Sequence, residues 1–283
     1  MRIKPTLLNF LHSVAQQSLL VPGYSLIPIS RTKGATFPTG FRSTRLYSSL
    51  NNHSPRGSMH TIVFDLDGTL VDSSGGLQDA VNTFLKAEGY RGSPLSKKEV
   101  EPMMGDGIHT VANRALKYVG LPEKSDPLSD GKSLGLIYNQ NPSGKTVVYE
   151  GVYDTLAILK DHRFPMVVCT NKAQAPALQI LQQLDLLHFF DGQCVGGDVL
   201  SVRKPHADHL LHAVGLVGGN PNKVVMIGDG HNDVLVAKNA NVPCIALSWG
   251  YSRIPLSELE PEMIIDDFRE IPTAINNILS LDL

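Results

Sequence analysis

The sequence predicts an α/β fold, a doubly wound parallel sheet with a helical segment inserted after its first strand. From residue 59 onward, short apolar segments alternate with amphipathic ones, and strands separated by single helices pair in parallel. Between residues 74 and 149 this alternation gives way to helical periodicity without a clear strand. With 283 residues, 42% of them hydrophobic, the chain is long enough for a large domain and a smaller one.

Residues 1–58 differ from the rest and are predicted to be a disordered extension or a transit peptide. They contain no Asp or Glu, and their Arg, Lys and Ser content is typical of organelle targeting. Arg45-Leu-Tyr47-Ser48 resembles a mitochondrial processing site. Alternatively, the true start lies near Met59, directly before the first strand. The first hypothesis predicts a mitochondrial protein, or one of another organelle, and the second predicts a cytoplasmic one.

The core is predicted to comprise residues 59–73 and 150–283. Its strands are expected at 61–64, 166–170, 193–195, 223–227 and 244–248. Its helices are expected at 152–160, 176–184, 207–214, 234–239 and 271–279. Within the insert, residues 74–149, helices are expected at 77–89 and 107–119, with a weaker one near 134–139. We expect this helical cap to lie over the end of the first strand.

Composition argues against several classes of protein. The net charge of -2 is unlike the basic excess of most nucleic-acid-binding surfaces. No apolar run reaches the roughly 18 residues of a membrane-spanning helix. Cys169, Cys194 and Cys244 lie far apart, which indicates reduced thiols in or near the core. We therefore predict a soluble monomer or homodimer without nucleic-acid or membrane partners.

Two acids stand where the first strand is predicted to end. Asp65 and Asp67 follow the apolar segment 61–64, and Gly68 and Thr69 then turn the chain. Side chains separated by one residue on a strand point the same way, so the two carboxylates repel each other. No structural requirement explains that arrangement. A bound cation, or chemistry that uses both acids in turn, would explain it.

Further polar residues are predicted to reach the same edge of the sheet. Thr170 and Asn171 end the second strand, Lys204 precedes a helix, and Asp229 and Asp233 follow the fourth strand. Several carboxylates suit Mg²⁺, while ammonium, hydroxyl and backbone N–H groups suit phosphoryl oxygens. The residues therefore predict phosphoryl transfer, in which a carboxylate attacks phosphorus and water hydrolyses the resulting aspartyl-phosphate. Asp233 has an alternative interpretation as the cap of the following helix.

In this order, the segments resemble the motifs of the haloacid dehalogenase (HAD) superfamily of aspartate-dependent phosphatases. The matching segments are Asp65-x-Asp67-Gly68-Thr69, Thr170, Lys204 and Gly228-Asp229-x-x-x-Asp233. The resemblance covers almost everything from Met59 to the C-terminus. It implies a Rossmann-like core with an inserted type-1 helical cap.

The resemblance also implies a role for each motif residue. Asp65 would be the nucleophile, and Asp67 would be the general acid and then the base. The residues implied to bind the phosphoryl group are Thr69, Thr170, Asn171 and Lys204. The residues implied to hold Mg²⁺ are Asp65, Asp67 through its backbone carbonyl, Asp229 and Asp233.

Longer matches favour one substrate. The segments 196–205, 104–107 and 248–251 resemble bacterial-type phosphoglycolate phosphatases, although Ala207 and Gly230 depart from their usual pattern. We therefore expect hydrolysis of 2-phosphoglycolate to glycolate and phosphate. The alternatives are another small sugar or nucleoside phosphate, pyrophosphate, or a β-phosphoglucomutase-like phosphomutase. Candidate ligands for the substrate carboxylate are His109, Arg114, Lys117 and the backbone of residues 105–107.

Overall fold

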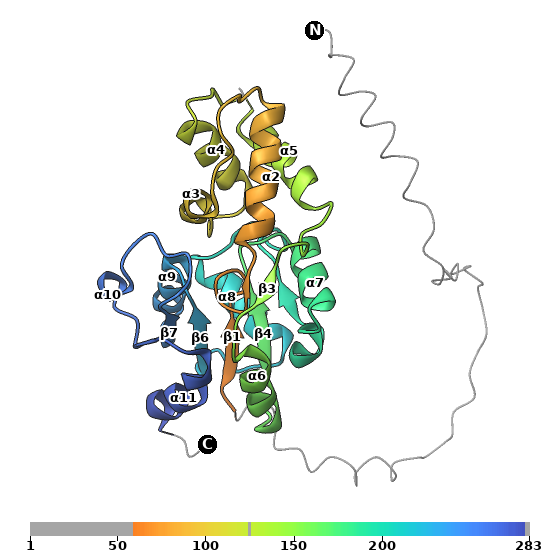
Figure 1. Cartoon of the computed structure of the whole chain (residues 1–283). Coiled ribbons are helices and arrows are strands. Elements are labelled where there is room, and N and C mark those ends of the chain that lie inside the picture. The colour runs from red at the N-terminus through yellow and green to blue at the C-terminus, as the bar shows by residue number, and fades with distance from the viewer. Residues whose placement is uncertain (1–58, 124–125, 281–283) are drawn as a thin grey trace, which may run out of the picture. The chain divides into compact units, whose positions relative to one another are not determined.

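The computed structural model describes residues 59–123 and 126–280, which form a core and a helical insert (Figure 1). The interpretation of residues 1–58 as an extension or transit peptide lies outside the described residues. No helix in the described part of the chain is long and apolar enough to cross a membrane. The three cysteines are free and buried, as the sequence predicted.

The core is built on a parallel sheet of six strands with the order β5-β4-β1-β6-β7-β8. The strands are β1 (Thr61–Phe64), β4 (Met166–Cys169), β5 (Cys194–Val195), β6 (Val224–Gly228), β7 (Cys244–Leu247) and β8 (Met263–Ile265). Phe64, the last residue of β1, pairs with Val168 of β4 and with Ile227 of β6. The central strands therefore end at one level, and the predicted α/β fold class is confirmed. β8 was missed because three residues, of which only Ile265 is buried, are too few for a periodic pattern.

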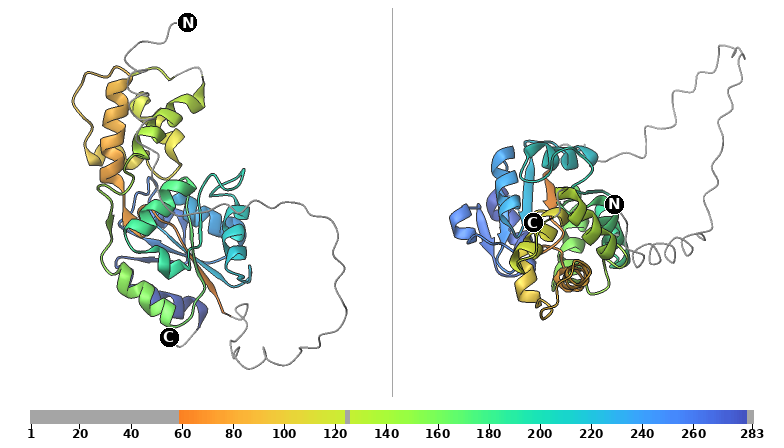
Figure 2. Two further views of the ribbon diagram at one scale, coloured as in Figure 1. Left: turned by 90° about the vertical axis from the view of Figure 1, so that its right-hand side faces the viewer. Right: turned by 90° about the horizontal axis from the view of Figure 1, so that it is seen from above.

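Helices cover both faces of the sheet. The helices of one layer are α6 (Val152–Asp161), α7 (Gln174–Gln183) and α11 (Ile271–Leu279). The helices of the other layer are α8 (Ala207–Leu216) and α9 (His231–Ala240). Successive side chains of β1 point to opposite faces of the sheet, so each face has its own apolar cluster. Ile62 and Phe64 pack with the first layer of helices, and Val63 packs with the second. The core is thus three layers deep (Figure 2).

The insert forms a small helical cap with its own apolar centre. Its helices are α2 (Ser74–Ala87), α3 (Lys97–Val100), α4 (Ile108–Tyr118) and α5 (Pro127–Tyr138), with a 3₁₀ turn at Glu101–Met103. Helix α5 is longer than the weak helix predicted near 134–139. The first part of α5 lacked an apolar pattern because Gly131 stands at a packing position. A Cβ at residue 131 would overlap the His109 ring of α4, so this position holds a glycine instead of an apolar residue.

Two short strands connect the cap to the core. β2 (Val71–Asp72) and β3 (Val147–Val148) pair in antiparallel fashion where the chain leaves the core and where it returns. The expectation that the insert has no strand was therefore wrong at 147–148. Two residues cannot display a period, so the sequence carried no usable signal for this pair.

Candidate active site

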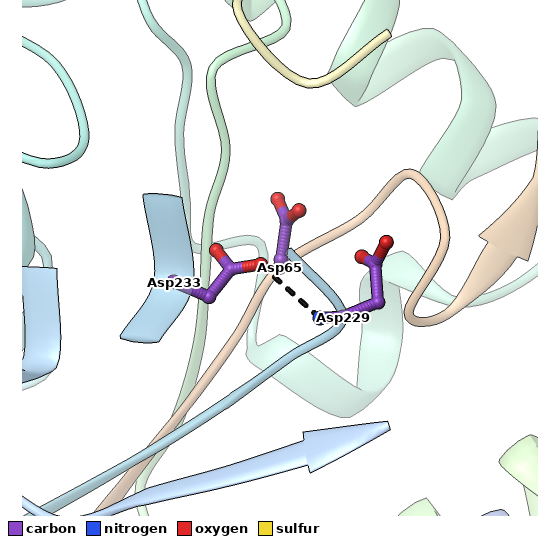
Figure 3. Close-up of side chains that lie close together, drawn as sticks. All are labelled: Asp65, Asp229 and Asp233. Carbon is purple, nitrogen blue, oxygen red and sulfur yellow. Dashed lines mark hydrogen bonds between the residues drawn. The ribbon is translucent and has the colours of Figure 1, made fainter. Parts of the chain in front are cut away.

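Three carboxylates converge at the carboxyl edge of the sheet (Figure 3). Asp65 follows β1, Asp229 follows β6, and Asp233 lies in the first turn of α9. One oxygen from each lies within 4.8 Å of the other two. The convergence follows from the topology, because β1 and β6 are parallel neighbours that end together.

A buried lysine separates two of these acids. Lys204 Nζ lies 2.8 Å from Asp65 Oδ1 and 2.6 Å from Asp233 Oδ1, and the lysine side chain is 1% exposed. Burial by itself would lower the pKa of Lys204, but the charges of Asp233 and Asp65 outweigh it and raise that pKa. The ammonium therefore remains protonated between the two carboxylates.

The protonation of the acids is governed by burial. Burial raises the pKa of Asp65 to about 7, although Lys204 opposes the shift. Burial also raises the pKa of Asp229 well above its usual value, and the charges of Asp233 and Asp65 add to this effect. Asp229 accepts hydrogen bonds only from neutral donors among the described residues, the Thr69 hydroxyl at 3.0 Å and the Tyr251 N–H at 2.7 Å. Its negative charge is therefore left without a cationic partner there.

Asp233 caps a helix, as one interpretation of the sequence suggested, and it also lies among the converging acids. Its Oδ2 accepts hydrogen bonds from the backbone N–H groups of Asp229 (3.1 Å) and Gly230 (3.0 Å), which caps the start of α9. Its Oδ1 accepts a hydrogen bond from Lys204 and so faces the other acids. The cap interaction fixes the carboxylate in the position that makes it part of the site.

Asp67 has contacts of its own. Its Oδ1 accepts a 2.5 Å hydrogen bond from the Ser73 hydroxyl, and its Oδ2 lies 3.0 Å from Lys172 Nζ. The structure thus brings Asp65, Asp229 and Asp233 together, and it places the Asp67 carboxyl beside a second lysine. Lys172 was not predicted as a site residue, although its position directly after Thr170 and Asn171 was a usable signal.

The residues present fit a divalent cation. Four carboxylates, those of Asp65, Asp67, Asp229 and Asp233, face two ammonium groups, those of Lys172 and Lys204. With all four carboxyl groups ionised, the site has an excess of two negative charges in a largely buried position, which is unfavourable without a counter-ion and is the reason for the raised pKa values of Asp65 and Asp229. The donor atoms that converge are all carboxylate oxygens, the kind of ligand that Mg²⁺ prefers.

Besides Lys204, the other three predicted phosphoryl-binding residues have different surroundings. Thr69 donates its hydroxyl to Asp229, and Thr170 accepts a 3.2 Å hydrogen bond from the N–H of Lys172. Asn171 Nδ2 donates to the carbonyl oxygens of Gly105 (3.1 Å) and Lys204 (3.0 Å). Asn171 thereby holds a cap loop and the lysine loop together.

A cavity of about 100 Å³ lies beside the acids. Asp65, Asp67, Thr170 and Asn171 line it from the core. Its cap lining is mostly apolar and comes from α2, α4, α5 and the loop before α4, through Leu77, Met104, Gly105, Gly107, Ile108, Val111, Gly135, Tyr138 and Asn139. The cavity holds a few water molecules or a small organic group.

One acid of the cap ties this lining to the core. Asp106 Oδ2 accepts hydrogen bonds from Arg114 (2.5 Å) and Arg253 (2.6 Å), and its Oδ1 accepts one from Asn232 (2.7 Å). Burial alone would raise the pKa of Asp106, but hydrogen bonds from His231 and these three residues hold it well below its usual value. This cluster was not predicted, because its members come from three separate segments.

The ligand candidates suggested for a substrate carboxylate are mostly placed elsewhere. Arg114 is engaged by Asp106 and by the Met103 carbonyl. Lys117 is exposed, and neither it nor His109 lines the cavity. Of the earlier candidates, only the backbone near Gly105 and Gly107 lines it.

Substitution of Gly250 should displace one of the converging acids. A Cβ at Gly250 would overlap the Cβ and carboxyl group of Asp229, and a Cβ at Gly68 would overlap the same carboxyl group, so Asp229 is closely packed against both glycines. We expect Gly250→Ala to lower Mg²⁺ affinity at least about tenfold, measured by calorimetric titration. Gly215→Ala is the matched control, because its Cβ meets nothing within 4 Å. Equal Mg²⁺ affinity in the two variants would contradict this packing argument.

Comparison with known proteins places the chain in a family. The family model described as haloacid dehalogenase-like hydrolase matches residues 62–247. A phosphoglycolate phosphatase of Agrobacterium fabrum is 35% identical over 216 residues, which cover 75% of this chain and 91% of that protein. A phosphoglycolate phosphatase of Caulobacter vibrioides is 34% identical over 222 residues, which cover 78% and 92%.

A solved structure agrees with this placement. The crystal structure of a predicted phosphoglycolate phosphatase from Haemophilus somnus superposes with a TM-score of 0.70 at 29% identity, covering 76% of this chain and 97% of that one. The matched region contains β1, β4, β6 and the residues that converge at their ends. The chain therefore belongs to the haloacid dehalogenase-like hydrolase family.

Proposed function

We propose that the protein is a phosphatase that hydrolyses 2-phosphoglycolate to glycolate and phosphate. The observation that carries this proposal is the position of Asp65. Its carboxylate lies at the end of the central strand, beside the Lys204 ammonium and two further acids, and it lines a cavity that Asp67 also lines. This arrangement combines a nucleophile with a separate proton donor.

The proposed chemistry gives the two acids different roles, Asp65 as the nucleophile and Asp67 as the group that moves the proton. In the first half-reaction, an Asp65 oxygen bonds to phosphorus, the bond from phosphorus to the leaving oxygen breaks, and Asp67 gives that oxygen a proton. In the second, Asp67 takes a proton from water as the water oxygen attacks phosphorus, which releases the Asp65 carboxylate. The separation of Asp67 from the other acids suits this role, because its carboxyl faces the cavity side of the site.

The remaining site residues would bind the phosphoryl oxygens and the metal ion. Lys204, Thr170 and the N–H groups near Asn171 would contact the phosphoryl oxygens. Asp65, Asp229 and Asp233 would hold Mg²⁺, with Asp67 contributing its backbone carbonyl. When bound, the ion would neutralise the excess negative charge, so that a carboxylate and a phosphate dianion can approach each other. We also propose that residues 74–149 act as the cap that limits access to the site.

The cavity size supports a small substrate. Its volume of about 100 Å³ is well below the 300–1,000 Å³ typical of sites for larger ligands. Glycolate is a small leaving group, whereas a hexose or a nucleoside is much larger. The relatives from Agrobacterium fabrum and Caulobacter vibrioides are phosphoglycolate phosphatases, which points to the same substrate. Both observations favour 2-phosphoglycolate over sugar phosphates and over a phosphomutase reaction.

A substrate panel tests this function. We expect the purified protein with Mg²⁺ to release phosphate from 2-phosphoglycolate at least about tenfold more efficiently than from hexose phosphates, nucleoside monophosphates or pyrophosphate. EDTA should lower kcat/KM at least about 100-fold, and added Mg²⁺ should restore it. A rearranged sugar phosphate without release of phosphate would instead identify a mutase.

A further inference from the structure

Lys172 gives the cavity a single positive charge. Among the described residues that line the cavity, it is the only cationic one. Its side chain is 11% exposed, and Nζ lies 3.0 Å from Asp67 Oδ2. A lysine held at low exposure against a mostly apolar cavity has lost most of its hydration, so it gains strongly from an anion that enters.

The contacts of Lys172 leave room for such an anion. Its ammonium donates a 2.9 Å hydrogen bond to the Tyr138 hydroxyl, which donates in turn to the Pro142 carbonyl at 3.1 Å. With Asp67, this accounts for two of its three N–H donors, and within the described residues the structure shows no third hydrogen-bond or ion-pair partner. The ammonium also lies over the Tyr138 ring, 4.6 Å from the ring centroid. Tyr138 therefore orients the ammonium without needing to contact a ligand itself.

We propose that Lys172 recognises the second anionic group of the substrate, which is the carboxylate of the glycolate moiety. This inference rests on the proposed function. It assigns the substrate specificity of the enzyme to Lys172, a core residue whose ammonium group is positioned by Tyr138 of the cap. The substrate class is that of short phosphate monoesters with a carboxylate next to the ester-bearing carbon.

The geometry sets the length of that substrate. In the proposed reaction the leaving oxygen meets Asp67, whose carboxyl is in contact with Lys172. In 2-phosphoglycolate the carboxylate carbon is only two bonds from the leaving oxygen. A single ammonium can therefore contact both Asp67 and the substrate carboxylate. A longer leaving group would carry its anionic end past Lys172.

Three other cations near the site are already engaged. Arg114 and Arg253 both donate to Asp106. Lys204 lies between Asp65 and Asp233, where the phosphoryl group is expected. Lys172 is thus the cation that combines low exposure, a place in the cavity wall and an unused donor.

Binding measurements on a protein that cannot turn over its substrate test this inference. In an Asp65→Asn background with Mg²⁺, calorimetric titration compares 2-phosphoglycolate with 2-hydroxyethyl phosphate, which replaces the carboxylate by a neutral hydroxymethyl group. With Lys172 intact, we expect about 30-fold tighter binding of 2-phosphoglycolate, the usual range for a hydrogen bond to a charged group. Adding Lys172→Met should reduce this preference to about threefold or less. Effects of the substitution that are common to both ligands cancel in the ratio of the two dissociation constants.

Two further variants make the test specific. Lys117→Met removes an exposed cap lysine and should keep the full preference. Tyr138→Phe removes only the hydroxyl that orients Lys172, and it should lower the preference in part. Lys172→Gln provides the same measurement if Lys172→Met does not fold.

The outcomes separate this inference from the proposed function. Equal affinity for the two compounds with Lys172 intact, or a full preference after its removal, would overturn the role of Lys172. Phosphate release from 2-phosphoglycolate by the unmodified protein is measured in parallel. Selective binding without any release would overturn the proposed function and leave the role of Lys172 standing.

Discussion

Asp65→Asn is expected to lower kcat/KM for 2-phosphoglycolate at least about 10⁴-fold. The amide preserves the shape of the side chain, but it cannot form the covalent phosphoryl intermediate. Removal of a nucleophile from other hydrolases costs about 10⁴- to 10⁶-fold, and each factor of ten is about 1.4 kcal/mol. Release of phosphate at saturating Mg²⁺ measures the effect. Asp79→Asn is the matched control, because Asp79 is an exposed acid of the cap.

The same variant should not lose stability. Burial raises the pKa of Asp65 to about 7, whereas its ordinary value is 3.8. The folded protein without metal therefore retains this proton up to about pH 7, while the unfolded chain releases it near pH 4. The contribution of Asp65 to stability falls as pH rises through this window. Asp65→Asn removes that penalty, so its melting temperature without metal should exceed that of the unmodified protein by a margin that grows from pH 5 to pH 7.

Two results would contradict this account of Asp65. Phosphatase activity close to that of the unmodified protein in Asp65→Asn would exclude covalent catalysis by this residue. A melting temperature well below that of the unmodified protein at pH 7 would show that Asp65 supports the fold. In that case, a loss of activity alone would not identify the nucleophile.

The core was predictable because its signals are local. The apolar run at 61–64 and the acids that follow it fix both the strand and the side chains at its end. The proximity of Asp65 and Asp229 can then be predicted from parallel pairing alone, since neighbouring parallel strands end at the same edge of the sheet. Asp233 follows because it lies one helical turn beyond Asp229.

The contacts between cap and core were not predictable in the same way. The Asp106 carboxylate meets Arg253 and Asn232, more than 100 positions away in the sequence, only because the cap loop lies over the start of α9 and the loop that follows β7. No period or motif links such residues. The same holds for Lys172 and Tyr138, whose contact depends on where α5 ends.

The cap and the core supply different parts of the site. The core supplies the charged groups, and the cap supplies most of the apolar wall that surrounds the cavity. Asn171 and Asn232 each donate a 3.1 Å hydrogen bond to the Gly105 carbonyl, so two core side chains hold one cap loop. An apolar wall strengthens every electrostatic interaction inside it, because it excludes water from around the charges. The structure of the cap thus increases the effect of the two buried lysines.

Lys204→Met is expected to affect both stability and catalysis. The change leaves Asp65 and Asp233 in contact with no ammonium group, and breaking a buried ion pair typically costs about 3–5 kcal/mol. We expect a loss of about 3 kcal/mol in the free energy of unfolding at pH 8 without metal. Loss of a cation near the phosphoryl oxygens should also lower kcat about 100- to 1000-fold. Urea denaturation and phosphate release measure the two effects.

The pH dependence of that loss identifies its cause. Lys204 opposes the rise in the pKa of Asp65, so its removal should raise that pKa further. At lower pH a bound proton can then replace the missing ammonium, because the folded protein binds protons more strongly than the unfolded chain. The stability deficit should therefore shrink between pH 8 and pH 6. Lys238→Met is the matched control, since Lys238 is 47% exposed and lies 3.8 Å from Glu260, where an ion pair contributes about 1 kcal/mol at most. A deficit in Lys204→Met that is as small as in this control, or independent of pH, would show that Lys204 does not neutralise the buried acids.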